Sequence, residues 1–122
     1  MYKVAKEIMI SATHRVREHQ GGCERTHGHN WKIIVVVGAD NLNEMGMVID
    51  FKELKKVMRE VIMPMDHNDI NLYPPFDKIN PTSENMAKYI FDEMGKRLND
   101  ERKRVVEVKV YETDTSVASY SI

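Results

Sequence analysis

The sequence predicts an α+β domain in which a four-stranded antiparallel sheet carries two helices on one face, in the order β-β-α-α-β-β. Three observations support this prediction. Runs of β-forming residues fill the first third of the chain, and two segments with apolar residues at helical spacing follow. Near the C-terminus, apolar and polar residues alternate as in a strand. The chain has 122 residues, the length of one ordinary domain. We therefore expect residues 1–122 to form a single domain.

The first two predicted strands are long. Residues 2–11 place most of their apolar side chains at one parity, and residues 26–38 contain a run of β-formers that begins at Trp31. The polar segment between them closes on Gly21-Gly22, which is a loop signal. Two such strands joined by a loop favour an antiparallel hairpin. In that hairpin, His14 at the end of the first strand lies close to the start of the second.

The first predicted helix begins after Asp50. Asp50 is a good N-cap, and Glu53, three residues later, completes a capping-box pattern. Apolar residues at helical spacing continue to Ile62, and Pro64 ends the pattern. Residues 65–81 then form a long segment without periodicity. A loop of this length in a small domain is more often functional than idle.

The second predicted helix has Thr82 as its N-cap and ends near Asn99. Alternating valines predict a strand over residues 104–111. Residues 112–115 are expected to form a turn, and residues 116–122 a last strand. These elements complete the β-β-α-α-β-β order.

A His-Gly-His segment starts the second strand. His27 and His29 point to the same face, because side chains alternate along a strand, and Gly28 leaves room for a close approach. Two converging imidazoles would make a partial site for zinc or a similar borderline metal, and His14 would supply a third ligand. Three imidazoles with an open position would be catalytic, whereas Cys23 as fourth ligand would close a structural site. The remaining interpretation is a solvated sheet edge that carries histidines.

Four further side chains are candidates for chemistry. Cys23, the only cysteine, follows two glycines in a polar loop, so it is either a reactive thiol near a metal or an inert small residue. His67, preceded by Asp66, would activate that thiol only if the fold brings them together; otherwise the pair caps a loop. Glu112 is either a solvated strand end or a carboxylate that accepts hydrogen bonds from an amidine-like ring edge.

Charge and composition bear on partners. The chain has 18 Lys and Arg against 19 Asp and Glu, a net charge of −1, so we expect no binding to nucleic acid or an anionic membrane. One cysteine forms no internal disulfide. We expect neither export nor membrane spanning, because the sequence shows no signal-peptide pattern and no apolar run approaching about 18 residues, and we expect a cytoplasmic protein.

Taken in order, these motifs resemble the 6-pyruvoyltetrahydropterin synthase / 6-carboxytetrahydropterin synthase family along essentially the whole chain. The segments that carry the resemblance are Ser11-Ala12-Thr13-His14, Cys23-Glu24-Arg25-Thr26-His27-Gly28-His29-Asn30, Gly46 to Lys55, Met65-Asp66-His67-Asn68-Asp69-Ile70-Asn71, Pro81-Thr82-Ser83-Glu84-Asn85 and Tyr111-Glu112-Thr113. The resemblance implies the tunnelling fold, in which subunits join their sheets into a barrel. It also implies a homo-hexamer built from two trimers.

The resemblance further implies Zn²⁺ on His14, His27 and His29 and a substrate of the 7,8-dihydroneopterin triphosphate type. The zinc would act as a Lewis acid on the side-chain hydroxyls of the substrate. Glu112 would hold the edge of the pterin ring.

The implied catalytic residues are Cys23 as general base, with Asp66 and His67 relaying the proton. Three residues separate Cys23 from His27, a short spacing that resembles the 6-carboxytetrahydropterin synthase branch. We therefore expect a lyase that forms 6-carboxytetrahydropterin. The adjacent Glu24 leaves formation of 6-hydroxymethyl-dihydropterin open, and 6-pyruvoyltetrahydropterin is another product of the family. A pterin-binding zinc protein without turnover is the non-enzymatic alternative.

Overall fold

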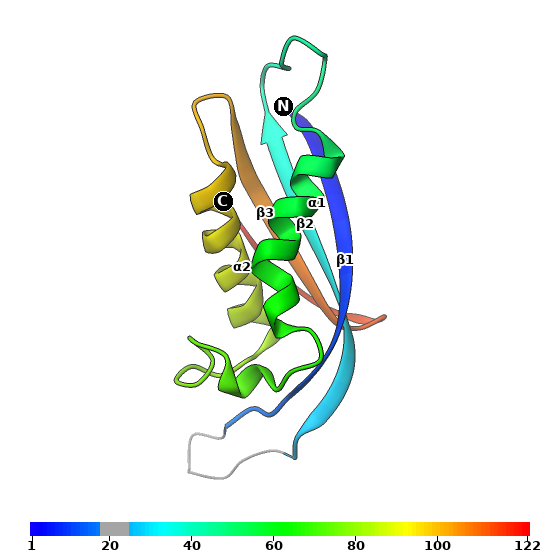
Figure 1. Ribbon diagram of the computed structural model, residues 1–122, viewed down its shortest axis with the longest axis vertical. Helices are drawn as coiled ribbons and strands as arrows, with labels where there is room; N and C mark the ends of the chain where they lie inside the picture. Colours follow the sequence, from blue (N-terminus) through cyan, green and yellow to red (C-terminus); the bar gives the residue numbers. More distant parts are fainter. Residues whose placement is uncertain (18–24) are drawn as a thin grey trace.

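The computed structural model describes residues 1–17 and 25–122, so the predictions for Cys23 and Glu24 lie outside the described residues. The elements follow the predicted order (Figure 1). The strands are β1 (Tyr2–His14), β2 (His27–Ala39), β3 (Lys103–Thr113) and β4 (Ser116–Ser121). The helices are α1 (Phe51–Ile62) and α2 (Ser83–Leu98), with short 3-10 helices at Met63–Met65 and Ile70–Leu72.

The four strands form one antiparallel sheet in the order β1-β2-β3-β4. Both helices lie against the same face of this sheet (Figure 1). The predicted α+β class and its element order are therefore confirmed. No helix within residues 1–17 and 25–122 is long and apolar enough to cross a membrane.

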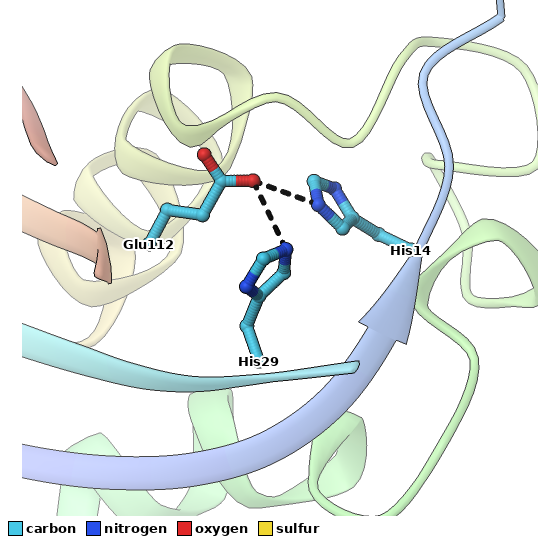
Figure 2. Close-up of side chains that lie close together, drawn as sticks. All are labelled: His14, His29 and Glu112. Atoms are coloured by element: carbon cyan, nitrogen blue, oxygen red, sulfur yellow. Dashed lines mark ion pairs between the residues drawn. The ribbon is translucent and has the colours of Figure 1, made fainter. Parts of the chain in front are cut away.

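The face of the sheet toward the helices carries the core. Ile10 pairs with Trp31 across β1 and β2, and both are buried. Because side chains alternate along a strand, the same face holds every second residue of each strand. His14 and His29 continue these two core-facing rows toward one end of the sheet (Figure 2). The end of the apolar core is thus lined by imidazoles.

Both predicted helix caps are present. The Asp50 carboxylate accepts a hydrogen bond from the backbone N–H of Lys52 at 2.8 Å. The Thr82 hydroxyl accepts one from the N–H of Asn85 at 3.1 Å. Each cap satisfies a backbone donor that the first turn of a helix leaves free.

Two strand limits differ from the prediction. Strand β1 continues to His14, because its last residues pair with the start of β2. Glu112 was expected in a turn but belongs to β3. Strand β3 reaches Thr113, which pairs with Ser116 and leaves only Asp114 and Thr115 for the turn. Glu112 therefore has a fixed place on the sheet.

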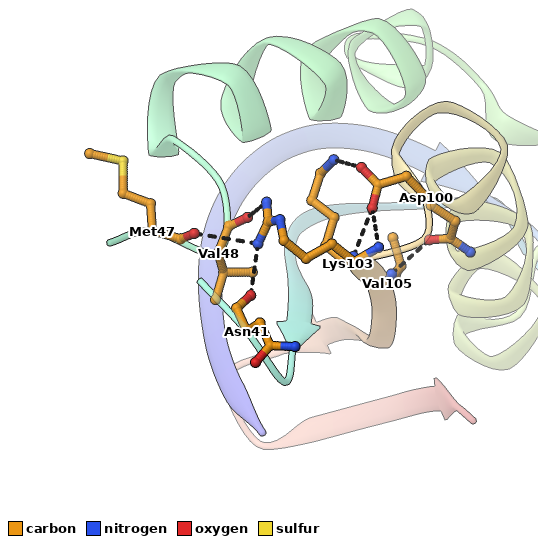
Figure 3. Close-up of polar contacts among 8 residues, drawn as sticks. Asn41, Met47, Val48, Asp100, Lys103 and Val105 are labelled. Atoms are coloured by element: carbon orange, nitrogen blue, oxygen red, sulfur yellow. Dashed lines mark hydrogen bonds and ion pairs between the residues drawn. The ribbon is translucent and has the colours of Figure 1, made fainter. Parts of the chain in front are cut away.

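Arg102 joins the start of β3 to the loop between β2 and α1 through hydrogen bonds to residues that include Asn41 and Val48, both labelled in Figure 3. Its guanidinium donates hydrogen bonds to the carbonyl oxygens of Asn41 at 3.1 Å, Met47 at 3.4 Å and Val48 at 2.7 Å. The planar fork of arginine suits several carbonyls at once. These bonds hold the loop at the end of the sheet opposite the imidazoles.

Arg102→Ala should lower the free energy of unfolding by about 1–3 kcal/mol, because three carbonyls lose a charged donor. Arg102→Lys should recover only part of this loss, since a single ammonium does not reproduce the fork. Urea unfolding monitored by circular dichroism measures the change. The control is Arg104→Ala, at an exposed neighbouring position of β3. Equal stabilities for Arg102→Ala and Arg104→Ala would contradict the assigned role.

Candidate active site

His14, His29 and Glu112 meet at one end of the sheet (Figure 2). Glu112 Oε1 lies 2.8 Å from His14 Nε2 and 3.4 Å from His29 Nε2. One ligand atom from each residue lies within 4.8 Å of the other two. The three side chains come from β1, β2 and β3, which are neighbours in the sheet. This arrangement is a possible metal site.

Trp31 forms the floor beneath the two imidazoles. Its side chain is 0% exposed, and its ring centroid lies 4.7 Å from that of His14 and 5.4 Å from that of His29, both in edge-to-face geometry. Its indole N–H donates to the carbonyl of Ala12 at 3.2 Å. Trp31 therefore restricts the orientation of both imidazoles and joins them to the core.

A backbone carbonyl fixes the tautomer of His14. His14 Nδ1 lies 2.9 Å from the carbonyl oxygen of Pro81, which only accepts, so Nδ1 carries the hydrogen. In a neutral imidazole Nε2 then presents a lone pair toward the Glu112 carboxylate, which is also an acceptor. Two acceptors at 2.8 Å require a proton or a cation between them. The donor set of this cluster therefore fits a cation such as zinc.

The surroundings of His29 shift its pKa in the direction that favours the neutral, metal-binding form. Burial lowers the pKa of His29, the negative charge of Glu112 opposes that shift, and the neighbouring His14 and His27 lower the pKa further. A lowered pKa means that the imidazole stays neutral to a lower pH than an exposed histidine. Metal ligation needs that neutral form.

His27 lies beside the cluster rather than within it. It pairs with His14 across β1 and β2, and its ring centroid is 6.1 Å from that of His29. Of the three predicted zinc ligands, the structure brings His14 and His29 together with Glu112, and it places His27 next to them.

The loop that carries Asp66 and His67 runs along the free edge of β1. The N–H of His67 donates to the carbonyl of Ser11 at 2.6 Å, and the N–H of Thr13 donates to the carbonyl of Asn68 at 3.1 Å. The Asp66 carboxylate accepts from the N–H of Ser11 at 2.9 Å. Its other oxygen lies 3.5 Å from His67 Nε2. The predicted Asp-His pair is therefore held on the strand that ends in His14.

A pocket of about 500 Å³ lies between His29 of the cluster and His67 of the loop. Its walls are residues 11–13 of β1, 28–30 of β2 and 67–69 of the loop. His29 and His67 thus line the same pocket, although they lie far apart in the sequence. The position of Cys23 relative to this pocket lies outside the described residues and stays a prediction.

Two asparagines hold the chain just after His14. The Asn71 amide bonds both the N–H and the carbonyl of Arg15, at 2.8 and 3.0 Å. The Asn80 amide does the same for Arg17, at 2.8 and 2.9 Å. Each asparagine amide thus makes the two backbone hydrogen bonds that a neighbouring strand would otherwise make. Residues 15–17 are therefore fixed against the loop that precedes α2.

Comparison with known proteins identifies the family of this chain. Residues 3–122 match the family model described as 6-pyruvoyl tetrahydropterin synthase. The chain belongs to this family. It is 36% identical over 132 residues to human 6-pyruvoyl tetrahydrobiopterin synthase, which covers 97% of this chain and 90% of the human protein. It is also 32% identical over 126 residues to 6-carboxy-5,6,7,8-tetrahydropterin synthase of Bacillus subtilis, which covers 98% of this chain and 84% of that protein.

A solved structure supports the fold assignment. The 6-pyruvoyl tetrahydropterin synthase of Caenorhabditis elegans superposes with a TM-score of 0.84 at 24% identity, covering 99% of this chain and 95% of that one. The predicted membership of the synthase family and the tunnelling fold of the subunit are confirmed.

The sequence did not reveal that Glu112 lies against the imidazoles. The family resemblance predicted that Glu112 contacts only the pterin ring. Its proximity to His14 and His29 depends on the pairing between β2 and β3, which places Tyr111 opposite Lys32. The contact of Glu112 with the two imidazoles could have been predicted only from the correct register of these two strands.

Proposed function

We propose that this member of the 6-pyruvoyl tetrahydropterin synthase family is a zinc-dependent lyase. Its substrate is 7,8-dihydroneopterin triphosphate, and its product is 6-carboxytetrahydropterin. The observation that carries the proposal is the pocket lined both by His29, a member of the cluster with His14 and Glu112, and by His67 of the neighbouring loop. Relatives named for the carboxy product and for the pyruvoyl product both cover nearly the whole chain. The short spacing between Cys23 and His27 favours the carboxy product.

The metal would be held by His14, His27 and His29. When bound, zinc supplies Lewis acidity to the side-chain hydroxyls of the substrate. The support for these ligands is the tautomer of His14, the lowered pKa of His29 and the cross-strand pairing of His14 with His27. The pairing brings the backbones of His14 and His27 close together. We infer that a change of rotamer would bring the exposed His27 imidazole to the site.

The remaining residues divide binding and proton transfer between them. Cys23 acts as general base and removes a proton from the substrate side chain. Asp66 and His67 receive and relay that proton; Asp66 is well suited because the N–H of Ser11 fixes one of its oxygens and the other faces His67. Glu112 accepts hydrogen bonds from the edge of the pterin ring.

Incubation of the zinc-loaded protein with 7,8-dihydroneopterin triphosphate tests the proposal. Mass spectrometry of the products distinguishes 6-carboxytetrahydropterin from the 6-pyruvoyl and 6-hydroxymethyl alternatives. Glu24, beside Cys23, is the residue to replace if the side chain is cleaved to the 6-hydroxymethyl product. Binding of the pterin without any product would instead support the second candidate, a pterin-binding zinc protein.

The third zinc ligand can be identified from metal content. His27→Ala should lose zinc on dialysis, because it removes a ligand, whereas Glu112→Gln should keep zinc and bind the pterin more weakly. Elemental analysis and a pterin titration measure the two effects. Zinc retained by His27→Ala and lost by Glu112→Gln would assign the third position to Glu112 instead.

We also propose that the protein forms a homo-hexamer of two trimers whose sheets close into barrels. Strands β1 and β4 are the edges of the sheet, and open edges favour pairing between chains. The sheet face away from the helices exposes apolar side chains, including Met9 at 59% and Val117 at 51%. Light scattering at micromolar concentration should give a hexameric mass, and a monomeric mass would rule out the barrel.

A further inference from the structure

His67 has an unusual backbone conformation. Its φ is +57°, and it is the only residue other than glycine with a positive φ within residues 1–17 and 25–122. The left-handed region is unfavourable for a residue with a Cβ, so neighbouring contacts must hold the chain there. Such conformations concentrate at functional sites.

Packing does not hold the His67 side chain. That side chain is 82% exposed, whereas the side chain of Asp66 is 17% exposed. The direction of the imidazole is therefore set by the backbone from which it projects. A change of φ at His67 would move the ring away from the Asp66 carboxylate and from the pocket that both His67 and Asn68 line.

The Asn68 side chain closes the turn around His67. Its amide nitrogen donates to the carbonyl of Pro64 at 2.9 Å and to the carbonyl of Asp66 at 3.0 Å. The Asn68 amide thus donates both of its hydrogen bonds to backbone carbonyls that precede His67 in the chain. The backbone carbonyl of Asn68 accepts from Thr13 at 3.1 Å, so the far side of the turn is fixed to β1.

We propose that Asn68 is a positioning residue whose side-chain amide holds His67 in the left-handed conformation and thereby aims its imidazole at the pocket. The consequence for turnover rests on the proposed function, in which His67 relays a proton. The conformational part does not, because it concerns only the hydrogen bonds of Asn68 and the φ of His67.

A double-mutant cycle on thermal stability tests the conformational part without substrate. In the wild-type background, His67→Gly should raise the melting temperature by a few degrees, because glycine adopts a positive φ without steric cost. In the Asn68→Ala background the turn should relax, and His67→Gly should then lower the melting temperature through the greater entropy of the unfolded chain. An equal shift in both backgrounds would overturn the proposal, since β1 alone would then hold the conformation.

Turnover tests the second part. Asn68→Ala should lower kcat by about 10–100-fold with little change in KM or zinc content, because displaced catalytic groups cost rate rather than binding. Asn68→Asp keeps the shape but loses both N–H donors, and it should not restore kcat. The control is Asn43→Ala, because Asn43 also organises a loop, accepting from the N–H groups of Met45 and Met47 at 3.0 Å each, but at the opposite end of the sheet.

The outcomes separate this inference from the proposed function. Full kcat in Asn68→Ala, or an equal loss in Asn43→Ala, would overturn the positioning role. A wild-type protein without any turnover would refute the proposed function and leave the stability cycle to decide the conformational role of Asn68.

Discussion

Cys23→Ala is expected to keep its zinc and its oligomeric state and to lose turnover, with kcat lower by about 10²–10⁴-fold. That range is typical for loss of a positioned general base. Under our proposal the metal needs only histidine ligands, so the thiol is free to act on the substrate. Pterin binding should persist in this variant, because Glu112 is unchanged.

His29→Ala is the matched contrast and should lose zinc and turnover together. His29 lies in the cluster with His14 and Glu112, and burial lowers the pKa of its imidazole. Removal of a direct ligand should weaken zinc binding more than the roughly 10–100-fold that loss of an outer partner costs. Elemental analysis after dialysis, combined with single-turnover kinetics, separates the two variants.

Two results would contradict this division of roles. Loss of zinc from Cys23→Ala would make the thiol a ligand and the site a closed structural one. Retained zinc with full turnover would remove Cys23 as the base, and Glu24 would become the next residue to replace.

Trp31→Ala should lower the free energy of unfolding by about 3–5 kcal/mol, the range seen when a large aromatic side chain is removed from a core. Its side chain is 0% exposed and touches both the apolar core and the imidazoles of His14 and His29. For a domain whose total stability is about 5–15 kcal/mol, this loss is large. Chemical denaturation of the metal-free protein measures it without a contribution from zinc.

Two further variants define the origin of that loss. Trp31→Phe keeps much of the apolar contact but removes the hydrogen bond to Ala12, so its loss should be smaller. Met45→Ala, at a side chain that is 78% exposed, should change stability by less than about 0.5 kcal/mol. A loss below about 1 kcal/mol for Trp31→Ala would mean that Trp31 does not support the site.

The sequence by itself determined the order of the elements, both helix caps and the shared face of His27 and His29. Each of these depends on residues that are close together in the chain. Asp50 and Thr82 cap backbone groups two or three residues away, and alternation along one strand fixes which side chains share a face. The ordered motifs also identified the family, which the family model confirms over residues 3–122.

The tertiary structure decided which groups meet at the site. Glu112 reaches His14 and His29 through the register of β2 and β3, and the Asp66-His67 loop meets β1 through bonds between residues more than 50 positions apart. Local propensity contains no information about such pairings, because they depend on how all the strands and loops pack together. The left-handed backbone of His67 has the same origin. A histidine does not favour that conformation by itself, and contacts from Asn68 and β1 hold it there.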